Sequence, residues 1–304
     1  MNYEEFKEYI LRALREHYGE ERIVTVERTT KKNNRHPEGI CARKKNNPER
    51  VTPVIYLEEL YRNYQEGMEL EACIKDVCER IEDTEYLEEM EKFVERIEDW
   101  QYVKEHVYPV LLSTEGNQEL LKSLISTPML DLSVIYSIRL DLKEKGSADV
   151  KVNEVLLRLY GISREELHQQ ALCNMEQDGY RFQSMAEMLK EMCPFAPCNE
   201  EQGEKEKDEN EPPMYVLTNR DKKYGAAGIL NWRLLQEFAG GRSFYILPSS
   251  CHETIFIPAE MEGDPKILDH MVADINRTEV LQEERLSNHS YYYDGEAGDI
   301  RLCA

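Results

Sequence analysis

The spacing of apolar positions changes along the chain, and each spacing predicts a type of element. In residues 3–17 the apolar side chains recur every three or four positions, which predicts an amphipathic helix. Residues 22–28 and 39–45 predict two strands joined by a turn rich in Asn and Pro, and 51–55 predicts a short third strand. The chain therefore begins with a helix followed by a small β-meander.

Three helices with narrow apolar faces are expected next, between residues 56 and 100. Strand-like patterns then return: 107–113 predicts a strand, 118–125 a short helix, and 130–142 a strand because its apolar positions alternate. Ser163 and Glu166 have the spacing of a capping box, which predicts a helix that runs to about residue 177. The apolar positions in 182–192 predict one more helix.

The densest apolar pattern lies between Met214 and Pro258, and with the residues that follow it predicts a β-α-β-β-α-β-β series. Asp264 and Pro265 mark the start of its second helix, because Asp caps helices and Pro suits the first helical position. We expect an antiparallel sheet covered by helices on one face, and a helix-rich α+β fold for the whole chain. The expected elements are strands at 214–218, 243–247, 254–257, 290–293 and 300–303, and helices at 226–238 and from Asp264.

The domain organisation is less sharply defined by the sequence. We expect an N-terminal region of helix, β-meander and helices at 1–105 and a C-terminal α+β domain at 106–304, with one continuous domain as the alternative. Residues 199–213, NEEQGEKEKDENEPP, contain no apolar residue and predict a flexible acidic segment. Such a segment marks either a domain edge or an insertion inside one domain.

Composition narrows the class of protein. The 304 residues are 41% hydrophobic and 32% charged, and no run approaches the ~18 apolar residues of a membrane span. The N-terminal residues lack the basic region and cleavage site of a signal peptide, so we expect a cytoplasmic protein. The eight cysteines are scattered, and Cys193 and Cys198 have a spacing that neither a zinc knuckle nor a redox motif uses. We expect reduced structural cysteines, no metal and no cofactor.

Charge is distributed unevenly. The net charge of −22 disfavours general nucleic-acid binding, because phosphate contacts need clustered Lys and Arg. Between Arg28 and Arg50, however, eight basic residues stand against two acidic ones, a local excess of six positive charges. This excess predicts either an anion or partner patch or simply a solvated hairpin face. The patch candidates are Arg28, Lys31, Lys32, Arg35, Arg43, Lys44 and Lys45.

The sharpest candidate for chemistry is the run Ser249, Ser250, Cys251, His252 and Glu253. A hydrolase would use Ser250 or Cys251 as nucleophile and His252 or His289 as base, with Asp294 as a further partner. Neighbouring residues of an extended chain point to opposite faces, and no G-x-S-x-G elbow surrounds the serines. The alternative is a structural hairpin turn whose polar side chains bind turn amides.

Two further candidate sites have less support from the spacing of their residues. A metal site from His252, Glu253, His289 and Asp294 lacks the spacing that would fix the ligands on one helix. The glycines in Lys222–Gly228 lack the spacing of a phosphate-binding loop, and these small residues are better explained by close approach of a helix to the sheet.

Short fragments distributed over nearly the whole chain carry a family resemblance. They include PVIYLE from Pro53, LDLSVIY from Leu130, SREELH from Ser163, MYVLTN from Met214, ILPSSCHE from Ile246, NRTEV from Asn276 and YYYD from Tyr291. Together they resemble an uncharacterised bacterial family, a domain of unknown function found in anaerobic Gram-positive gut bacteria. Asn288 and Gly295 depart from the acidic and basic residues expected near the final Tyr-Tyr-Asp. The resemblance implies no activity.

Three functions therefore remain open. The first is a non-catalytic intracellular binding or adaptor protein with an unknown protein partner. The second is a hydrolase centred on Ser250, His252 and Glu253. The third is a nucleic-acid-associated factor that uses the basic hairpin at 28–50.

Overall fold

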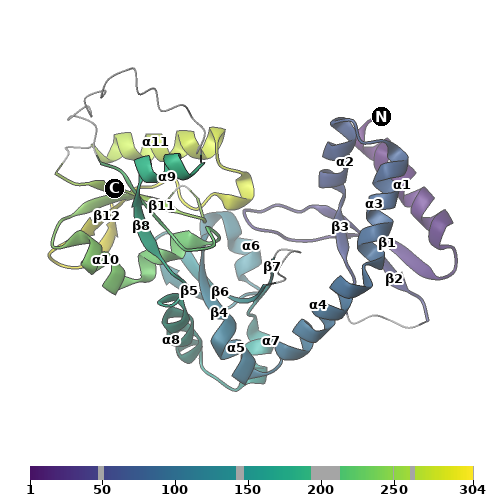
Figure 1. The fold of residues 1–304 in the computed structure, drawn as a ribbon, viewed down its shortest axis with the longest axis horizontal. Coiled ribbons are helices and arrows are strands. Elements are labelled where there is room, and N and C mark those ends of the chain that lie inside the picture. Colours follow the sequence, from purple (N-terminus) through teal and green to yellow (C-terminus); the bar gives the residue numbers. More distant parts are fainter. Residues whose placement is uncertain (47–50, 142–146, 193–212, 249, 261–263, 304) are drawn as a thin grey trace. The chain divides into compact units, whose positions relative to one another are not determined.

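Three antiparallel sheets and the helices packed on them organise the chain, which has the expected α+β fold (Figure 1). The computed structural model describes residues 1–46, 51–141, 147–192, 213–248, 250–260 and 264–303. By its internal contacts the chain divides into two compact units, Met1–Asp99 and Trp100–Ala304. No helix within the described ranges combines the length and the apolar character needed to cross a bilayer.

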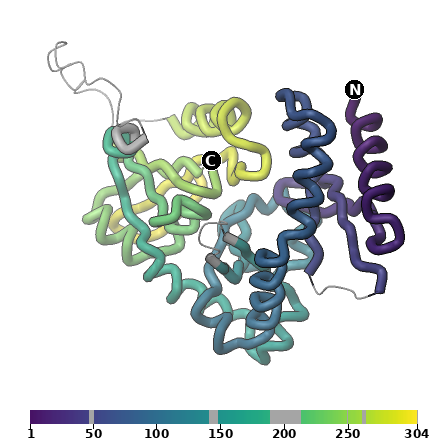
Figure 2. Tube along the Cα trace, turned by 45° about the vertical axis from the view of Figure 1, so that its right-hand side comes forward, coloured from purple at the N-terminus to yellow at the C-terminus, as the bar shows by residue number. Residues whose placement is uncertain are grey.

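The N-terminal unit consists of a three-stranded sheet, in the order β1-β2-β3, and the helices α1 to α4. Asn2 and Glu5 form a capping box that fixes the start of α1. Helices α1 and α3 lie side by side (Figure 2), and the unit's core includes Phe6, Ile10 and Val77. The elements are α1 (Tyr3–Tyr18), β1 (Arg22–Arg28), β2 (Glu38–Lys44), β3 (Val54–Tyr56), α2 (Leu57–Gln65), α3 (Leu70–Glu82) and α4 (Thr84–Arg96).

The first sheet of the C-terminal unit is built around the long strand β6. One edge of β6 pairs with β4, and the other pairs with β5 and β7 in succession. Helix α8 packs against β4, and its start is the predicted capping box of Ser163 and Glu166. The elements are α5 (Trp100–His106), β4 (Val107–Ser113), η1 (Glu115–Asn117), α6 (Gln118–Leu121), β5 (Ser126–Met129), β6 (Leu132–Asp141), β7 (Ser147–Lys151), α7 (Glu154–Tyr160) and α8 (Arg164–Met175).

The second sheet of this unit has six strands in the order β13-β12-β10-β11-β9-β8. It contains the predicted β-α-β-β-α-β-β series and adds β8 at one edge. The elements are β8 (Arg181–Ser184), α9 (Met185–Met192), β9 (Tyr215–Thr218), η3 (Gly225–Leu230), α10 (Trp232–Ala239), β10 (Phe244–Leu247), β11 (Thr254–Pro258), α11 (Pro265–Thr278), η4 (Gln282–Glu284), β12 (Tyr291–Asp294) and β13 (Asp299–Leu302).

Helices cover both faces of this sheet, so the expectation of a single covered face was wrong. Phe238 of α10 stacks on Phe182 at 3.5 Å between ring centroids and contacts Phe256 on the same face. Because strand residues alternate between faces, Ile257 points the other way, where it packs against Leu268 of α11.

Two elements also differ from the sequence prediction. The helix expected at 226–238 is split at Asn231 into η3 and α10, and Asn231 caps α10 by accepting a hydrogen bond from Leu234. The helix expected at 182–192 begins as strand β8, whose residues pair with β9. A contact with a strand more than thirty residues away thus overrides the local pattern.

Candidate functional site

The predicted polar run occupies the turn between β10 and β11, where Ser249 lies outside the described residues. Ser250 is buried, and its Oγ accepts a hydrogen bond from the His252 backbone N–H at 3.0 Å. Cys251 is only 3% exposed and packs against Val110, Leu112 and Tyr224. Both candidate nucleophiles therefore face the interior.

His252 holds another loop in place. Its Nδ1 accepts a hydrogen bond from the Tyr224 backbone N–H at 3.3 Å, and its Nε2 lies 3.3 Å from Glu284 Oε1. Its carbonyl accepts a hydrogen bond from Thr218 Oγ1 at 2.9 Å. The neighbouring Glu253 has a pKa raised by burial, which outweighs the opposing effect of His252. These contacts fit the structural role that we considered for this turn.

The other proposed partners bind elsewhere. His289 Nδ1 lies 3.6 Å from Asp269 Oδ2 of α11, and Asp294 Oδ1 accepts hydrogen bonds from the N–H groups of its own turn at Glu296 and Ala297. Within the described ranges, no hydrogen bond or ion pair joins either residue to His252. In the part of the chain that the structure describes, no three His, Cys, Asp or Glu side chains are arranged to hold a metal ion; Cys193 and Cys198 lie outside it.

A polar cavity of about 280 Å³ lies beside the loop that His252 holds. This loop connects β9 to η3, and two of its residues, Lys222 and Tyr224, have left-handed φ angles of 51° and 57°. Left-handed backbone at non-glycine residues costs free energy and is concentrated at functional sites. The cavity is lined by Arg139, Leu140, Ala148, Asp149, Asp221, Lys223 and Tyr224.

Arg139 is the central cation of this region. Its Nη1 donates to Asp178 Oδ2 at 2.9 Å, and its guanidinium lies over the Tyr108 ring at 4.2 Å. The same Asp178 oxygen accepts a hydrogen bond from Asn219, which is 1% exposed. Arg139 Nε and Nη2 are buried and have no hydrogen-bond partner. The ion pair with Asp178 thus fixes the guanidinium, and its Nε and Nη2 atoms lie out of reach of solvent.

A second charged pair lies next to Arg139 on the paired strands β6 and β7. Asp149 accepts hydrogen bonds from Ser137 and from Lys151, whose ammonium lies 4.9 Å from the centre of the Tyr224 ring. Burial raises the pKa of Asp149, but the charge and hydrogen bond of Lys151 and the Ser137 hydroxyl outweigh burial and leave it below its usual value. Asp149 is therefore held as a carboxylate.

The cavity contains recognition groups rather than a catalytic set. Burial raises the pKa of Tyr224 beyond the range in which its hydroxyl would serve as a base. Among the described side chains that line the cavity there is no Ser, Cys or His. What the arrangement offers is a fixed guanidinium, a lysine, two carboxylates and an aromatic wall, the kinds of group that orient a small polar ligand.

The seven basic residues of the predicted patch lie near the two ends of the β1–β2 ladder. Arg28, Lys31, Lys32 and Arg35 belong to the turn end, whereas Arg43, Lys44 and Lys45 lie at the other end, where Lys44 is paired with Arg22. Arg43 bonds to Glu27 at 2.6 Å and Lys45 to Glu20 at 2.5 Å. The local positive charge is therefore divided and partly neutralised.

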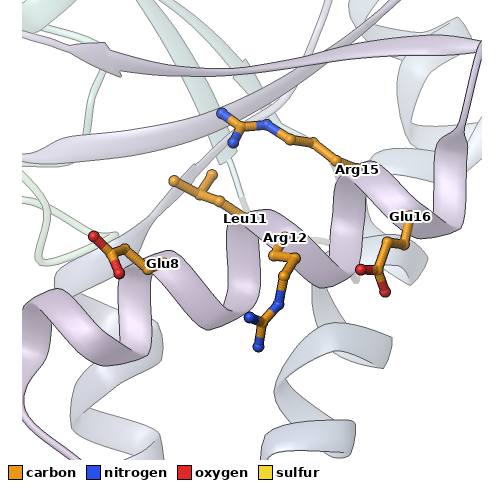
Figure 3. A pocket seen from close by; sticks show the side chains of 5 residues that line it. All are labelled: Glu8, Leu11, Arg12, Arg15 and Glu16. Carbon is orange, nitrogen blue, oxygen red and sulfur yellow. The ribbon is translucent and has the colours of Figure 1, made fainter.

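A shallow hollow of about 580 Å³ lies on the surface of α1 (Figure 3). The named side chains that line it are Glu8, Leu11, Arg12, Arg15 and Glu16, and Figure 3 shows Arg12 pointing away from Arg15. Glu8, Arg12 and Glu16 follow one another at intervals of four, the spacing of opposite charges on a solvated helix face. The two glutamates and two arginines balance, so this hollow has no distinct ligand preference.

Sequence reasoning missed Arg139 and its neighbours. The strand at 130–142 was predicted, and within it Arg139 stands between Ile138 and Leu140. In the alternating pattern Arg139 falls on the same face as Ser133, Ser137 and Asp141, so the sequence marks it only as a polar-face residue. Its partners Asp178 and Asn219 could not be identified, since neither is near it in sequence.

The fold and the cavity define an α+β protein with a small polar cavity in its C-terminal unit. The chain belongs to a family of unknown function, DUF5688, whose model matches residues 3–295. No curated protein and no solved structure matches the chain. The resemblance to a family of unknown function is therefore confirmed, and the comparisons indicate no specific activity.

Proposed function

We propose that this protein is a non-catalytic binding protein whose C-terminal unit holds a small polar ligand in the cavity at Arg139 and Tyr224. The observation that carries the proposal is the lining of this cavity, which combines the guanidinium of Arg139, held by Asp178, with two carboxylates and the ring of Tyr224. Charged and aromatic groups that converge on one small cavity orient a polar ligand by hydrogen bonds and ion pairs.

The hydrolase alternative has less support. A nucleophile needs a base within hydrogen-bond reach, and Ser250 Oγ meets the backbone N–H of His252 rather than its imidazole. The imidazole itself is engaged by the Tyr224 N–H and Glu284. The division of the basic residues between two ends of a hairpin likewise favours a ligand-binding function over nucleic-acid binding.

Saturation-transfer difference NMR tests the proposal with a mixture of small carboxylates, inorganic phosphate, sugars and free amino acids. We expect at least one component to receive saturation from the wild-type protein and to lose it in Arg139→Met. The matched control is Arg242→Met, because the Arg242 guanidinium also lies over an aromatic ring, that of Phe244, at 5.4 Å. Binding that is unchanged in Arg139→Met, or no binding at millimolar concentration, contradicts the proposal.

A parallel assay addresses the hydrolase. A panel of fluorogenic ester, amide and phosphate substrates is run on wild type and His252→Ala. We expect no turnover that depends on His252, because that side chain fixes a loop. Turnover that disappears in His252→Ala while the variant stays folded would favour the enzyme.

Cytoplasmic residence and an origin in anaerobic Gram-positive gut bacteria are part of this proposal. They are supported by the free thiols among the described residues, such as Cys73 and Cys251, and by the family resemblance noted in the sequence.

A further inference from the structure

We infer that His252 is a positioning residue for the cavity wall: its neutral imidazole holds the backbone of Tyr224, and uptake of a proton at Nδ1 releases the loop that carries Tyr224. This contact between His252 and Tyr224 is called the latch below. Its release by acid requires only groups of the protein itself, and it would alter the cavity that Tyr224 lines. Three observations support the latch: the direction of one hydrogen bond, the conformation of the loop, and the charges around the imidazole.

The hydrogen bond between Tyr224 and His252 defines the protonation state of the imidazole. A backbone N–H can only donate, so Nδ1, which lies 3.3 Å from the Tyr224 nitrogen, must carry a lone pair. The proton of the neutral ring is then on Nε2, which lies 3.3 Å from Glu284 Oε1 and donates to it. A second proton would enter at Nδ1, where it would meet the Tyr224 N–H. The closed latch therefore requires the neutral side chain.

The latch holds the loop at a residue with an unfavourable backbone conformation. Tyr224 has a φ of 57° and a ψ of 27°, a left-handed conformation that is rare for a bulky side chain and persists only where surrounding contacts impose it. One of those contacts is the hydrogen bond to Nδ1, and another is the Tyr224 ring, whose centroid lies 5.8 Å from that of the imidazole. Protonation of His252 thus breaks a contact at a residue whose backbone gains free energy by relaxing.

The charges around the imidazole favour its protonated form. Glu284 of η4 contacts Nε2, and Glu253 of the same turn is close enough for His252 to oppose the burial that raises the pKa of Glu253. These two carboxylates would compensate the charge of an imidazolium, whereas the Tyr224 N–H opposes it. Histidine is also the side chain that commonly changes charge between pH 5 and 8. The titratable groups that the structure places around His252 are Glu253 and Cys251 of the turn, Glu284 of η4, and Lys222 and Tyr224 of the loop.

Hydrogen exchange of the Tyr224 amide in the full chain tests the latch without any ligand. Exchange is followed by NMR on protein labelled with nitrogen-15 at tyrosine and leucine, over the range of about pH 5–8 in which histidine changes charge. Each rate is compared with the intrinsic rate at the same pH to give a protection factor. We expect the protection of Tyr224 to fall about fivefold or more on acidification, the factor that one hydrogen bond represents. The matched control is the Leu234 amide, which donates at 3.1 Å to the Asn231 side chain, a group that does not titrate.

Three variants identify the titrating group. His252→Asn places a carbonyl oxygen near the position of Nδ1, so it should keep Tyr224 protected and make this protection independent of pH. His252→Ala has no acceptor and should give low protection throughout the pH range. Glu253→Gln removes a carboxyl group that also takes up a proton, and it should retain the response because the imidazole is still present. Circular dichroism establishes that each variant is folded.

The outcomes distinguish failure of the latch from failure of the proposed function. Protection of Tyr224 that is constant over the pH range, or that changes equally in His252→Asn, overturns the latch whatever binds in the cavity. A response that disappears in Glu253→Gln assigns the titration to Glu253 and overturns the latch as well. A response that depends on His252 supports the latch even where the NMR mixture shows no binding, and then only the proposed function fails.

The effect of the latch on the cavity rests on the proposed function and has its own readout. For any component of the NMR mixture that binds, we expect the affinity to fall several-fold between pH 8 and pH 5 in the wild-type protein, because Tyr224 leaves the wall. His252→Asn should remove this fall. An equal fall in both proteins overturns the effect on the cavity.

Discussion

Gly225, at the start of η3, lies against the end of β9 and the turn at 250–253. A Cβ atom at this position would lie 2.4 Å from the His252 carbonyl oxygen and 2.4 Å from Thr218 Oγ1. The backbone N–H of Asn219 would be 2.9 Å away. Two of these three neighbours are backbone atoms, so no side-chain rotation relieves the overlap. The change Gly225→Ala must therefore separate the loop from the turn at 250–253.

The loss of stability in Gly225→Ala has two sources, overpacking and a broken hydrogen bond. Overpacking of a well-packed interior costs typically 1–3 kcal/mol, about 2 kcal/mol here. Separation also breaks the 2.9 Å hydrogen bond from Thr218 to His252, worth about 1 kcal/mol. We expect Gly225→Ala to lower the free energy of unfolding of the C-terminal unit by about 2–4 kcal/mol.

Urea unfolding followed by tryptophan fluorescence measures this change, because both tryptophans, Trp100 and Trp232, belong to the C-terminal unit. Gly161→Ala is the matched control. Gly161 has a φ of +64° with no atom within 4 Å of the added Cβ, so its cost is conformational and about 1 kcal/mol. A Gly225→Ala variant that is no less stable than Gly161→Ala would refute the packing argument.

Three more changes test other parts of the same unit. Glu253→Gln should stabilise the protein at neutral pH, because burial raises the folded pKa of Glu253 and its ionisation therefore opposes folding. In melting curves recorded at pH 4–8, this advantage of the variant should fade as the pH falls through the raised folded pKa. Asp149→Asn should have the opposite sign, since the folded pKa of Asp149 is lowered: the destabilisation is present above the unfolded pKa and disappears as pH falls through the folded value. Asp131→Ala should lower the free energy of unfolding by about 2–3 kcal/mol, because Asp131 accepts 2.6 Å hydrogen bonds from both Ser287 and the buried Tyr291. In a double-mutant cycle, a Tyr291→Phe background should reduce this loss. Full additivity of the two changes would argue against the contact.

Local sequence patterns predicted most elements of the fold. The capping box of Ser163 and Glu166, the β1–β2 and β10–β11 hairpins and the start of α11 all depend on residues close together in sequence. Helix coverage of both sheet faces was missed because α10, with Phe238, and α11, with Leu268, each have an apolar stripe that fits either face. Alternation within a strand does not indicate which helix will cover which side.

The site was harder to predict for a physical reason. The sequence pattern drew attention to His252, but its partners Tyr224 and Glu284 are 28 and 32 residues away. The hydrogen bond of Arg139 to Asp178 spans 39 residues. Partners at such separations are determined by tertiary packing rather than by spacing, and a single sequence contains no pattern that pairs them.

Strands β8 and β9 are neighbours in the sheet although the acidic segment separates them in sequence. Ser184 is paired with Tyr215, and the Met185 N–H donates to the Met214 carbonyl at 2.9 Å. The chain therefore leaves and rejoins the sheet at adjacent points, on either side of residues 193–212, which lie outside the described ranges. Loop-closure entropy grows only logarithmically with length, by about 0.6 kcal/mol for each doubling. Evolution, or an engineer grafting a reporter domain, can thus lengthen this segment at little thermodynamic expense, provided that the two strands keep their register.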